Sequence, residues 1–326
     1  MTKLPPRFVP NDPHALLALQ ANELLRRQKD SWTQLADGYA SLAQVQVKEI
    51  QCDGFTVLLQ FNPGRMVSTS AKVDPKSIRE RRCFLCVEHL PSEQEGILVR
   101  NKFLILCNPA PIFHGHYTIS HILHRPQAIE ENVRDFLILA KEMGPDFTVF
   151  YNGPQCGASA PDHLHFQASP SGAIPVESDA LDANRRRNRA VHEEVQVFSL
   201  ADYGREAFVL EGNRIESIES ALRRLIDAMK SVFPGTEEPL MNILASYREN
   251  LWRLIMFPRS KHRPEAFFLE NDKRILVSPA AVDIGGLMIT PLERDFQRLD
   301  GPTIEGIFHE VSLSEDQSDR IFKAFA

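Results

Sequence analysis

The sequence has 326 residues, of which 43% are hydrophobic and 25% are charged, and its formal net charge is -6. These fractions are typical of a globular protein with a sizeable core. The negative charge argues against broad binding to nucleic acid or anionic membranes, which requires an extended basic surface. No apolar run is long enough to cross a bilayer, and the start MTKLPPRFVPNDPH is Pro-rich and polar, unlike a signal peptide. We therefore expect a cytoplasmic protein, in which five cysteines are better explained as reduced thiols than as a disulfide framework.

The first 170 residues predict one packing helix followed by strands, a second helix and two closing strands. An Asp53-Gly54 turn between two alternating runs is the strongest short hairpin signal in this part. The predicted elements are a helix at 13–28, a hairpin at 44–63, two strands joined by a Pro-punctuated loop at 97–123, a helix of about four turns at 125–144, and strands at 147–152 and 163–169 around a Gly/Ser loop.

The later part repeats this layout, with strands, a helix and then strand–loop–strand over LMNILASYRENLWRLIMFPR. The repetition suggests an internal duplication, in which the second copy lacks the imidazole pair of the first. We expect an N-terminal helical extension (1–40), a catalytic half (41–170), a polar connection (171–190) and a degenerate half that completes the site (191–326). Because hairpins dominate both halves, an α+β fold with antiparallel sheets is favoured over a doubly wound parallel sheet.

The stretch DHLHFQ carries the clearest chemical signal. Successive side chains of a strand point to opposite faces, so His163, His165 and Gln167 are expected on one face and Leu164 and Phe166 on the other. A single strand histidine is more often structural than catalytic. Two histidines and a glutamine on one face, directly after a Gly/Ser loop, favour a reactive site instead.

The preceding loop, YNGPQCGAS, carries Asn152, Gly157 and Ser159 between the two strands. Glycine lets a backbone approach a ligand closely, and asparagine and serine add hydrogen-bond donors. Such donors facing a neutral imidazole suit a phosphate ester, whose phosphorus the imidazole attacks while the donors hold the non-bridging oxygens. A plain connecting loop is the alternative when the loop is taken alone.

Cys83 and Cys86 form a Cys-x-x-Cys pair, which is compatible with half of a zinc site, a redox pair or inert buried thiols. The thioredoxin-like pattern of a redox pair is missing, and histidines that could complete a zinc site are plentiful nearby. Zinc is the favoured interpretation, and its role would be to pin this loop to the catalytic strand.

These motifs, together with FNPGR and NPAPIFHGHYTISHILH, resemble the transferase branch of the histidine-triad superfamily. This branch comprises galactose-1-phosphate uridylyltransferases, diadenosine tetraphosphate phosphorylases and GDP-hexose phosphorylases, and it has H-x-H-x-Q where the hydrolases have three histidines. The resemblance is strong over 62–168 and weaker over 240–292, and it is not seen in the first 40 or last 30 residues. Leu164 replaces the proline of the uridylyltransferase H-P-H motif.

The resemblance implies that His165 is the nucleophile of a nucleotidyl-imidazole intermediate and that Gln167 binds the transferred phosphate, assisted by Ser159 and Asn152. It also implies a zinc site of Cys83, Cys86, His163 and a histidine of the HILH segment. His124 is the expected fourth ligand, with His121 and His116 as rivals. Not all of the branch keeps zinc, and dimers are common in it.

Three basic residues are further candidates for phosphate binding. Arg65, in NPGR, stands where the family often places a phosphate-contacting residue, although a solvated surface arginine fits equally. Arg259 and Lys261, with His262, end the second copy of the motif and could reach an acceptor phosphate across the site.

Three functions are compatible with these motifs. The first is a nucleotidyltransferase or phosphorylase that cleaves a nucleoside diphosphate-X and passes the NMP to phosphate or a sugar phosphate. The second is a hydrolase of the same superfamily, and the third is a non-catalytic nucleotide-binding zinc module. Because a carboxamide cannot donate or accept a proton as imidazole does, Gln167 suits a leaving group that departs as a stabilised anion, which favours transfer.

Overall fold

The computed structural model describes residues 5, 7–70, 73–235 and 237–326. The strands are β1 (Phe8–Pro10), β2 (Gln46–Gln51), β3 (Thr56–Phe61), β4 (Gly96–Val99), β5 (Phe103–Cys107), β6 (Tyr117–His121), β7 (Phe147–Asn152), β8 (His165–Pro170), β9 (Arg186–His192), β10 (Val195–Leu200), β11 (Phe208–Gly212), β12 (Met241–Arg248), β13 (Leu251–Pro258) and β14 (Leu287–Thr290). The α-helices are α1 (Leu17–Ser31), α2 (Thr33–Ser41), α3 (Met66–Thr69), α4 (Pro75–Glu80), α5 (Val133–Met143), α6 (Val176–Asp179), α7 (Ile215–Val232), α8 (Ala281–Ile284), α9 (Glu293–Arg298), α10 (Gly301–Val311) and α11 (Glu315–Phe325).

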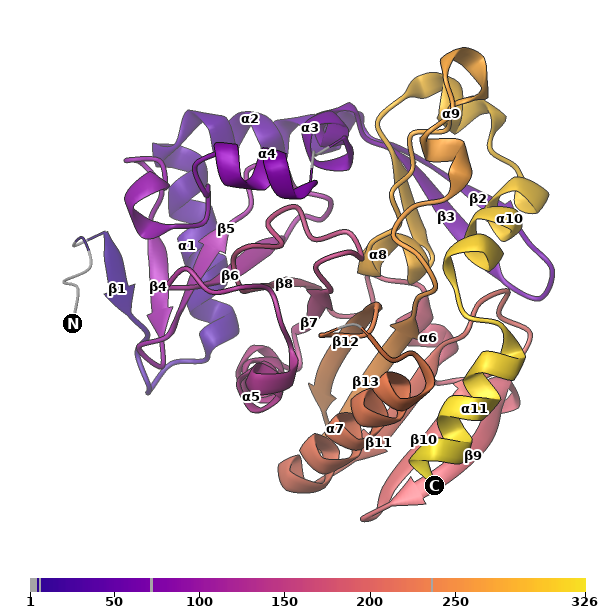
Figure 1. The fold of residues 1–326 in the computed structure, drawn as a ribbon. Coiled ribbons are helices and arrows are strands. Elements are labelled where there is room, and N and C mark those ends of the chain that lie inside the picture. Colours follow the sequence, from indigo (N-terminus) through magenta and orange to yellow (C-terminus); the bar gives the residue numbers. More distant parts are fainter. Residues whose placement is uncertain (1–4, 6, 71–72, 236) are drawn as a thin grey trace.

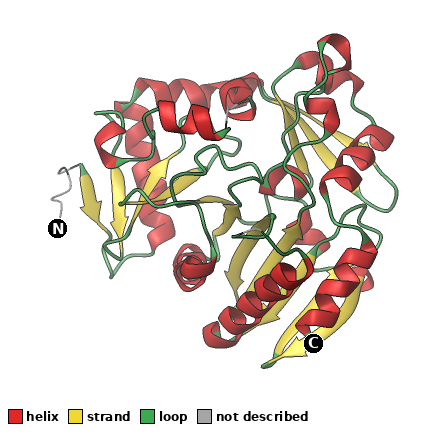
Figure 2. Cartoon of the chain, viewed as in Figure 1, coloured by secondary structure: helices red, strands yellow, loops and turns green. Residues whose placement is uncertain are grey.

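One large sheet runs through most of the described chain, in the order β1-β4-β5-β6-β8-β7-β12-β13-β11-β10-β9, and a small sheet has the order β14-β3-β2 (Figure 1). Neighbouring strands are antiparallel except for β1 with β4 and β14 with β3. Helices and strands are interspersed along the chain (Figure 2). The predicted α+β fold is confirmed.

The large sheet has the same strand order on both sides of its centre. Outward from the central β7–β12 pair, the order is β8, β6, β5, β4 on one side and β13, β11, β10, β9 on the other. In each half the central hairpin directly follows a helix, α5 or α7. This order agrees with the layout repeated in the sequence, while descent of the halves from one ancestral unit stays a prediction.

Two apolar cores cover the two faces of the sheet. One joins the sheet to α1, α5, α7 and α11 and includes Tyr151, Leu164, Phe166 and Ala168. The other lies between the sheet and the β2–β3–β14 layer and includes Phe150. Burial of each large apolar side chain stabilises the fold by about 1.5–3 kcal/mol. Because Phe166 and Ala168 face α5, His165 and Gln167 must face the opposite side of the sheet.

The structure differs from the sequence-based expectation at several boundaries. The region 97–123 contains three strands rather than two, because Arg100 and Asn101 both take positive φ and form a tight turn between β4 and β5. The helix expected at 125–144 begins only at Val133, after a 3-10 turn, because the segment after Pro126 is tied to the sheet by the Gln127 side chain. The predicted C-terminal boundary of the connection at 171–190 was wrong, because β9 already begins at Arg186 and pairs with β10.

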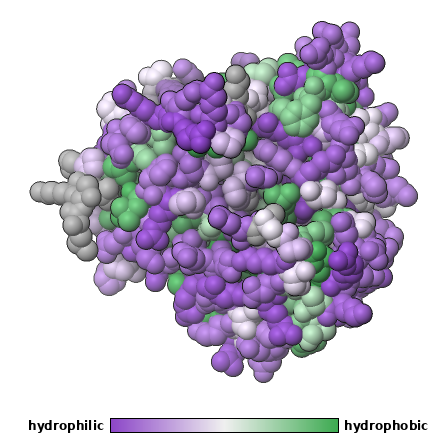
Figure 3. Space-filling view, in the orientation of Figure 1, coloured by the Kyte–Doolittle hydropathy of each residue, from purple (hydrophilic) through white to green (hydrophobic). Residues whose placement is uncertain are grey.

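The face of the molecule shown in Figure 3 is largely hydrophilic. Among the described residues, no helix is long and apolar enough to span a bilayer.

Candidate active site

His165 is the first residue of β8, and its ring is held in one tautomer. Nδ1 lies 2.8 Å from the carbonyl oxygen of His163, so Nδ1 carries the proton and donates it to that oxygen. Burial lowers the pKa of His165 to about 4, so the ring is neutral near pH 7. The lone pair is therefore on Nε2, and the residue lines a cavity.

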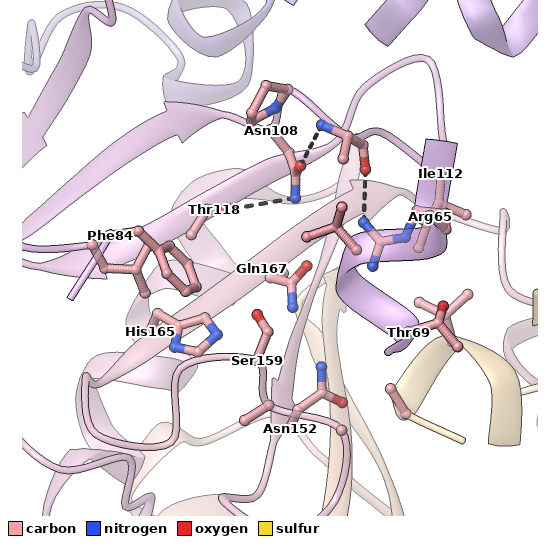
Figure 4. Close-up of a pocket in the computed structure, with 18 of the residues that line it drawn as sticks. Arg65, Thr69, Phe84, Asn108, Ile112, Thr118, Asn152, Ser159, His165 and Gln167 are labelled. Carbon is pink, nitrogen blue, oxygen red and sulfur yellow. Dashed lines mark hydrogen bonds between the residues drawn. The ribbon is translucent and has the colours of Figure 1, made fainter. Parts of the chain in front are cut away.

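This cavity has a volume of about 660 Å³ and is lined from both halves of the chain. Six of the predicted residues line it: Arg65, Asn152, Gly157, Ser159, His165 and Gln167. Figure 4 shows the His165 ring and the side-chain nitrogens of Asn152 and Gln167 turned toward the Ser159 hydroxyl. The predicted strand, loop and glutamine thus meet around one space large enough for a nucleotide-sized ligand.

The Gly/Ser loop requires glycine at Gly157. Its φ is +93°, and a Cβ there would lie 2.4 Å from the Cβ of Ala280, on the segment before α8. The loop therefore packs closely against the second half of the chain, which closes this side of the cavity.

A buried polar network fixes the Asn152 carboxamide. Its Oδ1 accepts hydrogen bonds of 2.8 Å from Asn242 Nδ2 and from the backbone N–H of Ala281. Asn242 is fully buried, and its own Oδ1 accepts a bond of 2.8 Å from the Arg259 guanidinium. Because these two bonds occupy its oxygen, the Asn152 carboxamide presents its NH₂ group toward the cavity.

The structure does not bring Arg259 or Lys261 to the cavity wall. The Arg259 guanidinium is buried and also donates to carbonyl oxygens of Val311, Pro279, Lys261 and His262. Lys261 pairs with Glu310 at 2.5 Å, and neither Arg259 nor Lys261 is among the described residues that line the cavity, whereas His262 is. The phosphate contact predicted for Arg259 and Lys261 is therefore not favoured by this geometry.

Arg65 is a cavity residue rather than a solvated surface arginine. Its Nη1 donates to the carbonyl oxygen of Ala110 at 2.7 Å, and burial lowers its pKa to about 10, which leaves it charged at neutral pH (Figure 4). Asp283 lines the same cavity, and burial raises the pKa of its carboxyl to about 6. Both carboxylate oxygens accept backbone N–H bonds, from Ala280 and Ile289.

The four predicted metal ligands lie together beside the cavity. Cys83 Sγ and Cys86 Sγ lie 3.3 and 3.6 Å from His163 Nδ1, and Cys86 Sγ lies 3.2 Å from His124 Nδ1. All four ligand atoms lie within 4.8 Å of one another. Tetrahedral zinc, with bonds of about 2.3 Å to sulfur and 2.05 Å to nitrogen, keeps these atoms about 3.5 Å apart. The donor set and its spacing therefore fit such an ion.

Neighbouring groups orient the two histidines toward the thiols. His163 Nε2 lies 2.7 Å from the carbonyl oxygen of His121, so Nε2 carries the proton and Nδ1 offers its lone pair to the sulfurs. His124 Nε2 lies 3.8 Å from a carboxylate oxygen of Asp162. His121 instead accepts a bond from the Leu123 N–H, and His116 lies against Gln167. Of these three histidines, it is His124 that lies in the group with the two thiols and His163.

His163 leaves the face of the strand on which it was expected. It precedes β8, and its N–H donates to the carbonyl oxygen of Ala160 rather than to a neighbouring strand. Its ring therefore points to the cysteines, while its carbonyl oxygen orients His165. One residue thus connects the possible metal site to the candidate nucleophile.

Comparisons with known proteins support the fold. Residues 24–170 match the family model of a domain of unknown function, DUF4922, and residues 180–324 match the model described as GDPGP1-like, C-terminal domain. The yeast Ap4A phosphorylase Apa2 in complex with AMP is 14% identical, covers 89% of this chain and 96% of its own, and has a TM-score of 0.55. The same enzyme in complex with Ap4A is 14% identical, with coverage of 87% and 97% and a TM-score of 0.53. No curated protein sequence matches the chain.

The chain therefore shares the fold of the yeast Ap4A phosphorylase, and its C-terminal part matches the GDPGP1-like model.

The sequence analysis did not identify several residues that hold the site together. Gln127 donates to the carbonyl oxygens of Asn152 and His165 and accepts the His165 N–H, so it clamps the backbone of both strands at the site. Asn242 and Asp283 come from the second half, more than 70 residues from the motif. Of these residues, only Gln127 could have been noticed from the sequence, because it follows the predicted ligand His124 by three positions.

Proposed function

We propose that the chain is a nucleotidyltransferase that cleaves a nucleoside diphosphate-X and passes the NMP to phosphate or a sugar phosphate. The observation that carries the proposal is the His165 ring. Its Nδ1–H is tied to the carbonyl oxygen of His163, and its Nε2 faces a cavity walled by hydrogen-bond donors. A neutral imidazole in a fixed tautomer is the form that attacks phosphorus.

The reaction consists of two displacements at one phosphorus atom. In the first, His165 Nε2 forms a bond to the α-phosphorus as the bond to the leaving oxygen breaks, and the phosphate or sugar phosphate departs as an anion. In the second, an oxygen of the acceptor phosphate attacks the same phosphorus and returns the electron pair to Nε2. Gln167, Asn152 and Ser159 supply donors for the non-bridging oxygens in both steps.

Gln167 favours phosphorolysis or transfer over hydrolysis. A carboxamide has no proton to give to a leaving group, and an anionic phosphate leaving group needs none. An acceptor phosphate likewise needs no general base, whereas water does. The resulting substrate classes are nucleotide sugars and dinucleoside polyphosphates, and the AMP and Ap4A bound by the yeast relative support a nucleotide in this cavity.

We assign Arg65 to the binding of a phosphate of the substrate, because it is a charged guanidinium in the cavity wall. The half over 41–170 would then carry the chemistry, and the half over 191–326 would complete the cavity from the other side. Arg259 and Lys261 stay predictions as phosphate ligands.

We further propose that Cys83, Cys86, His124 and His163 hold a structural zinc ion. When bound, the ion supplies a cross-link between the Cys83 loop and the residues that precede β8. His163 would then be fixed at its ring, and its carbonyl oxygen would hold the His165 proton in place.

The test is a panel of nucleoside diphosphate sugars and dinucleoside polyphosphates, incubated with and without inorganic phosphate and analysed for released nucleotides. We expect cleavage that requires phosphate and gives a nucleoside diphosphate, together with an acid-labile nucleotidyl-enzyme trapped in the absence of acceptor. Release of NMP at equal rates without phosphate would show a hydrolase. No cleavage and no trapped adduct over the whole panel would support the non-catalytic alternative.

A further inference from the structure

His116 is a buried histidine that neither the metal cluster nor the transfer chemistry uses. It lies just before β6, its side chain is fully buried, and its Nε2 lies 2.9 Å from Gln167 Oε1. The sequence suggested it only as a rival zinc ligand, and the structure places it against the glutamine instead.

A backbone donor decides the tautomer of this ring. The N–H of Ile112 points at His116 Nδ1 over 3.2 Å, and a backbone N–H can only donate. Nδ1 must therefore be the acceptor. Burial lowers the pKa of His116 to about 3, so the ring is neutral and carries a single proton, which lies on Nε2.

The proton on Nε2 in turn decides which end of the Gln167 carboxamide faces the ring. An Nε2–H donor requires the glutamine oxygen, at 2.9 Å. The Asn108 Nδ2 atom, 3.5 Å from the same nitrogen, is too distant to compete, and Asn108 Oδ1 is engaged by the Ala110 N–H at 2.9 Å. The NH₂ group of Gln167 is thereby turned away from His116. Figure 4 shows that it points toward Ser159.

We propose that His116 is a positioning residue, which holds the Gln167 carboxamide with its NH₂ group toward the cavity and so makes this wall a donor for an anionic phosphoryl group. Without the bond, the carboxamide can rotate by half a turn and present its oxygen to the substrate, which repels a phosphate oxygen. The inference rests on the proposed function, because it assigns to Gln167 the binding of the transferred phosphate.

Two substitutions of His116 distinguish the roles of its two ring nitrogens. His116→Asn keeps an acceptor near the position of Nδ1 for the Ile112 N–H but loses the donor to Gln167. His116→Gln can place an NH₂ near the position of Nε2 and should restore part of the function. The matched control is His114→Asn, the same change at an exposed histidine in the same loop.

The experiment measures phosphate-dependent turnover of the best substrate of the panel and calorimetric binding of AMP and GMP, together with thermal unfolding. We expect His116→Asn to lower turnover by about 10- to 100-fold, as loss of one transition-state donor does, while His116→Gln loses less and His114→Asn is unchanged. In a Gln167→Ala background, His116→Asn should change turnover by less than about twofold, because its effect passes through Gln167. Equal losses in both backgrounds would overturn the inference.

Gln167→Glu gives a second measurement if His116→Asn does not fold. The carboxylate can still accept the His116 proton but turns an oxygen to the cavity, so it should weaken nucleotide binding and turnover more than Gln167→Ala. Equal effects of the two substitutions, or a milder effect of the glutamate, would contradict the inference. A folded wild-type protein that binds neither nucleotide and cleaves no substrate would overturn the proposed function and this inference together.

Discussion

The central hairpins of the two halves differ most in their connections. β7 and β8 are joined by residues 153–164, a loop that contains Gly157, Ser159 and the His163 ring. β12 and β13 are joined only by Glu249 and Asn250, both with positive φ, as a tight hairpin turn requires. The same strand pairing thus supports a long loop at the cavity in one half and a minimal turn in the other.

The second hairpin still serves the site, but from its opposite end. Asn242, near the start of β12, donates to the Asn152 side chain and pairs with Asn152 in the ladder. Arg259, just after β13, donates to Asn242 and so fixes its side chain. Because β7 and β12 are antiparallel, the open end of the second hairpin reaches the loop end of the first. A half that lacks the imidazole pair can therefore still support the site of the other half.

The largest expected loss of turnover comes from a substitution in the half over 41–170. His165→Ala should lower turnover by about 10³-fold or more while leaving the fold intact, because it removes the attacking nitrogen. Steady-state kinetics against the exposed-site control His309→Ala would measure it. A variant that keeps a tenth of wild-type turnover would exclude His165 as the nucleophile.

The next effect concerns the Cys/His cluster of the same half. We expect about one zinc ion per chain by metal analysis. Its removal by a chelator should lower the free energy of unfolding by about 4 kcal/mol if the ion is present at a thousand times its dissociation constant. His163→Ala should act through this loss of metal and stability. A metal-free protein that is unaffected by chelators, or equal catalytic losses in well-folded His163→Ala and His165→Ala, would contradict this division.

A smaller effect is expected in the supporting half. Asn242→Ala leaves Asn152, Arg259 and the carbonyl oxygen of Cys156 each short of one partner. We expect a loss of about 2–3 kcal/mol in the free energy of unfolding and a roughly tenfold loss of turnover. Asn188→Ala, at an exposed position of β9, is the control for denaturant titration and kinetics. If stability falls but turnover is unchanged, Asn242 has only a structural role.

Lys261→Ala should have the smallest effect. Its partly exposed pair with Glu310 contributes less than about 1 kcal/mol, and its side chain lies outside the cavity lining. We expect turnover and the KM for phosphate to stay within twofold of wild type. A tenfold rise in that KM would instead support the contact between Lys261 and the acceptor phosphate that the sequence predicted.

Local patterns predicted the parts of the site that are close in sequence. Alternation in HLHFQ placed His165 and Gln167 opposite Phe166. The strand alternation depends on backbone geometry, which a short segment expresses by itself. The resemblance to the histidine-triad transferases, rather than a local pattern, implied the set Cys83, Cys86, His124 and His163 that the structure brings together.

Contacts between distant segments could not be predicted in this way. The pairing of β14 with β3 and the bonds from Asn242 to Asn152 join residues that no common motif connects. The role of His116 depends on the Ile112 N–H and on Gln167 together, and its sequence context suggested only metal binding. Where β9 begins was missed because its basic residues resemble a polar linker until β10 is placed beside it.

The β7–β12 ladder makes the two halves a single continuous sheet. A chain cut within 171–175, between β8 and α6, would give two fragments that each expose the edge of a long, mostly apolar strand, and such edges pair with other chains. The fragments should therefore aggregate when produced separately and assemble when produced together. Activity would return only on reassembly, so the junction offers a natural point for a split-protein reporter.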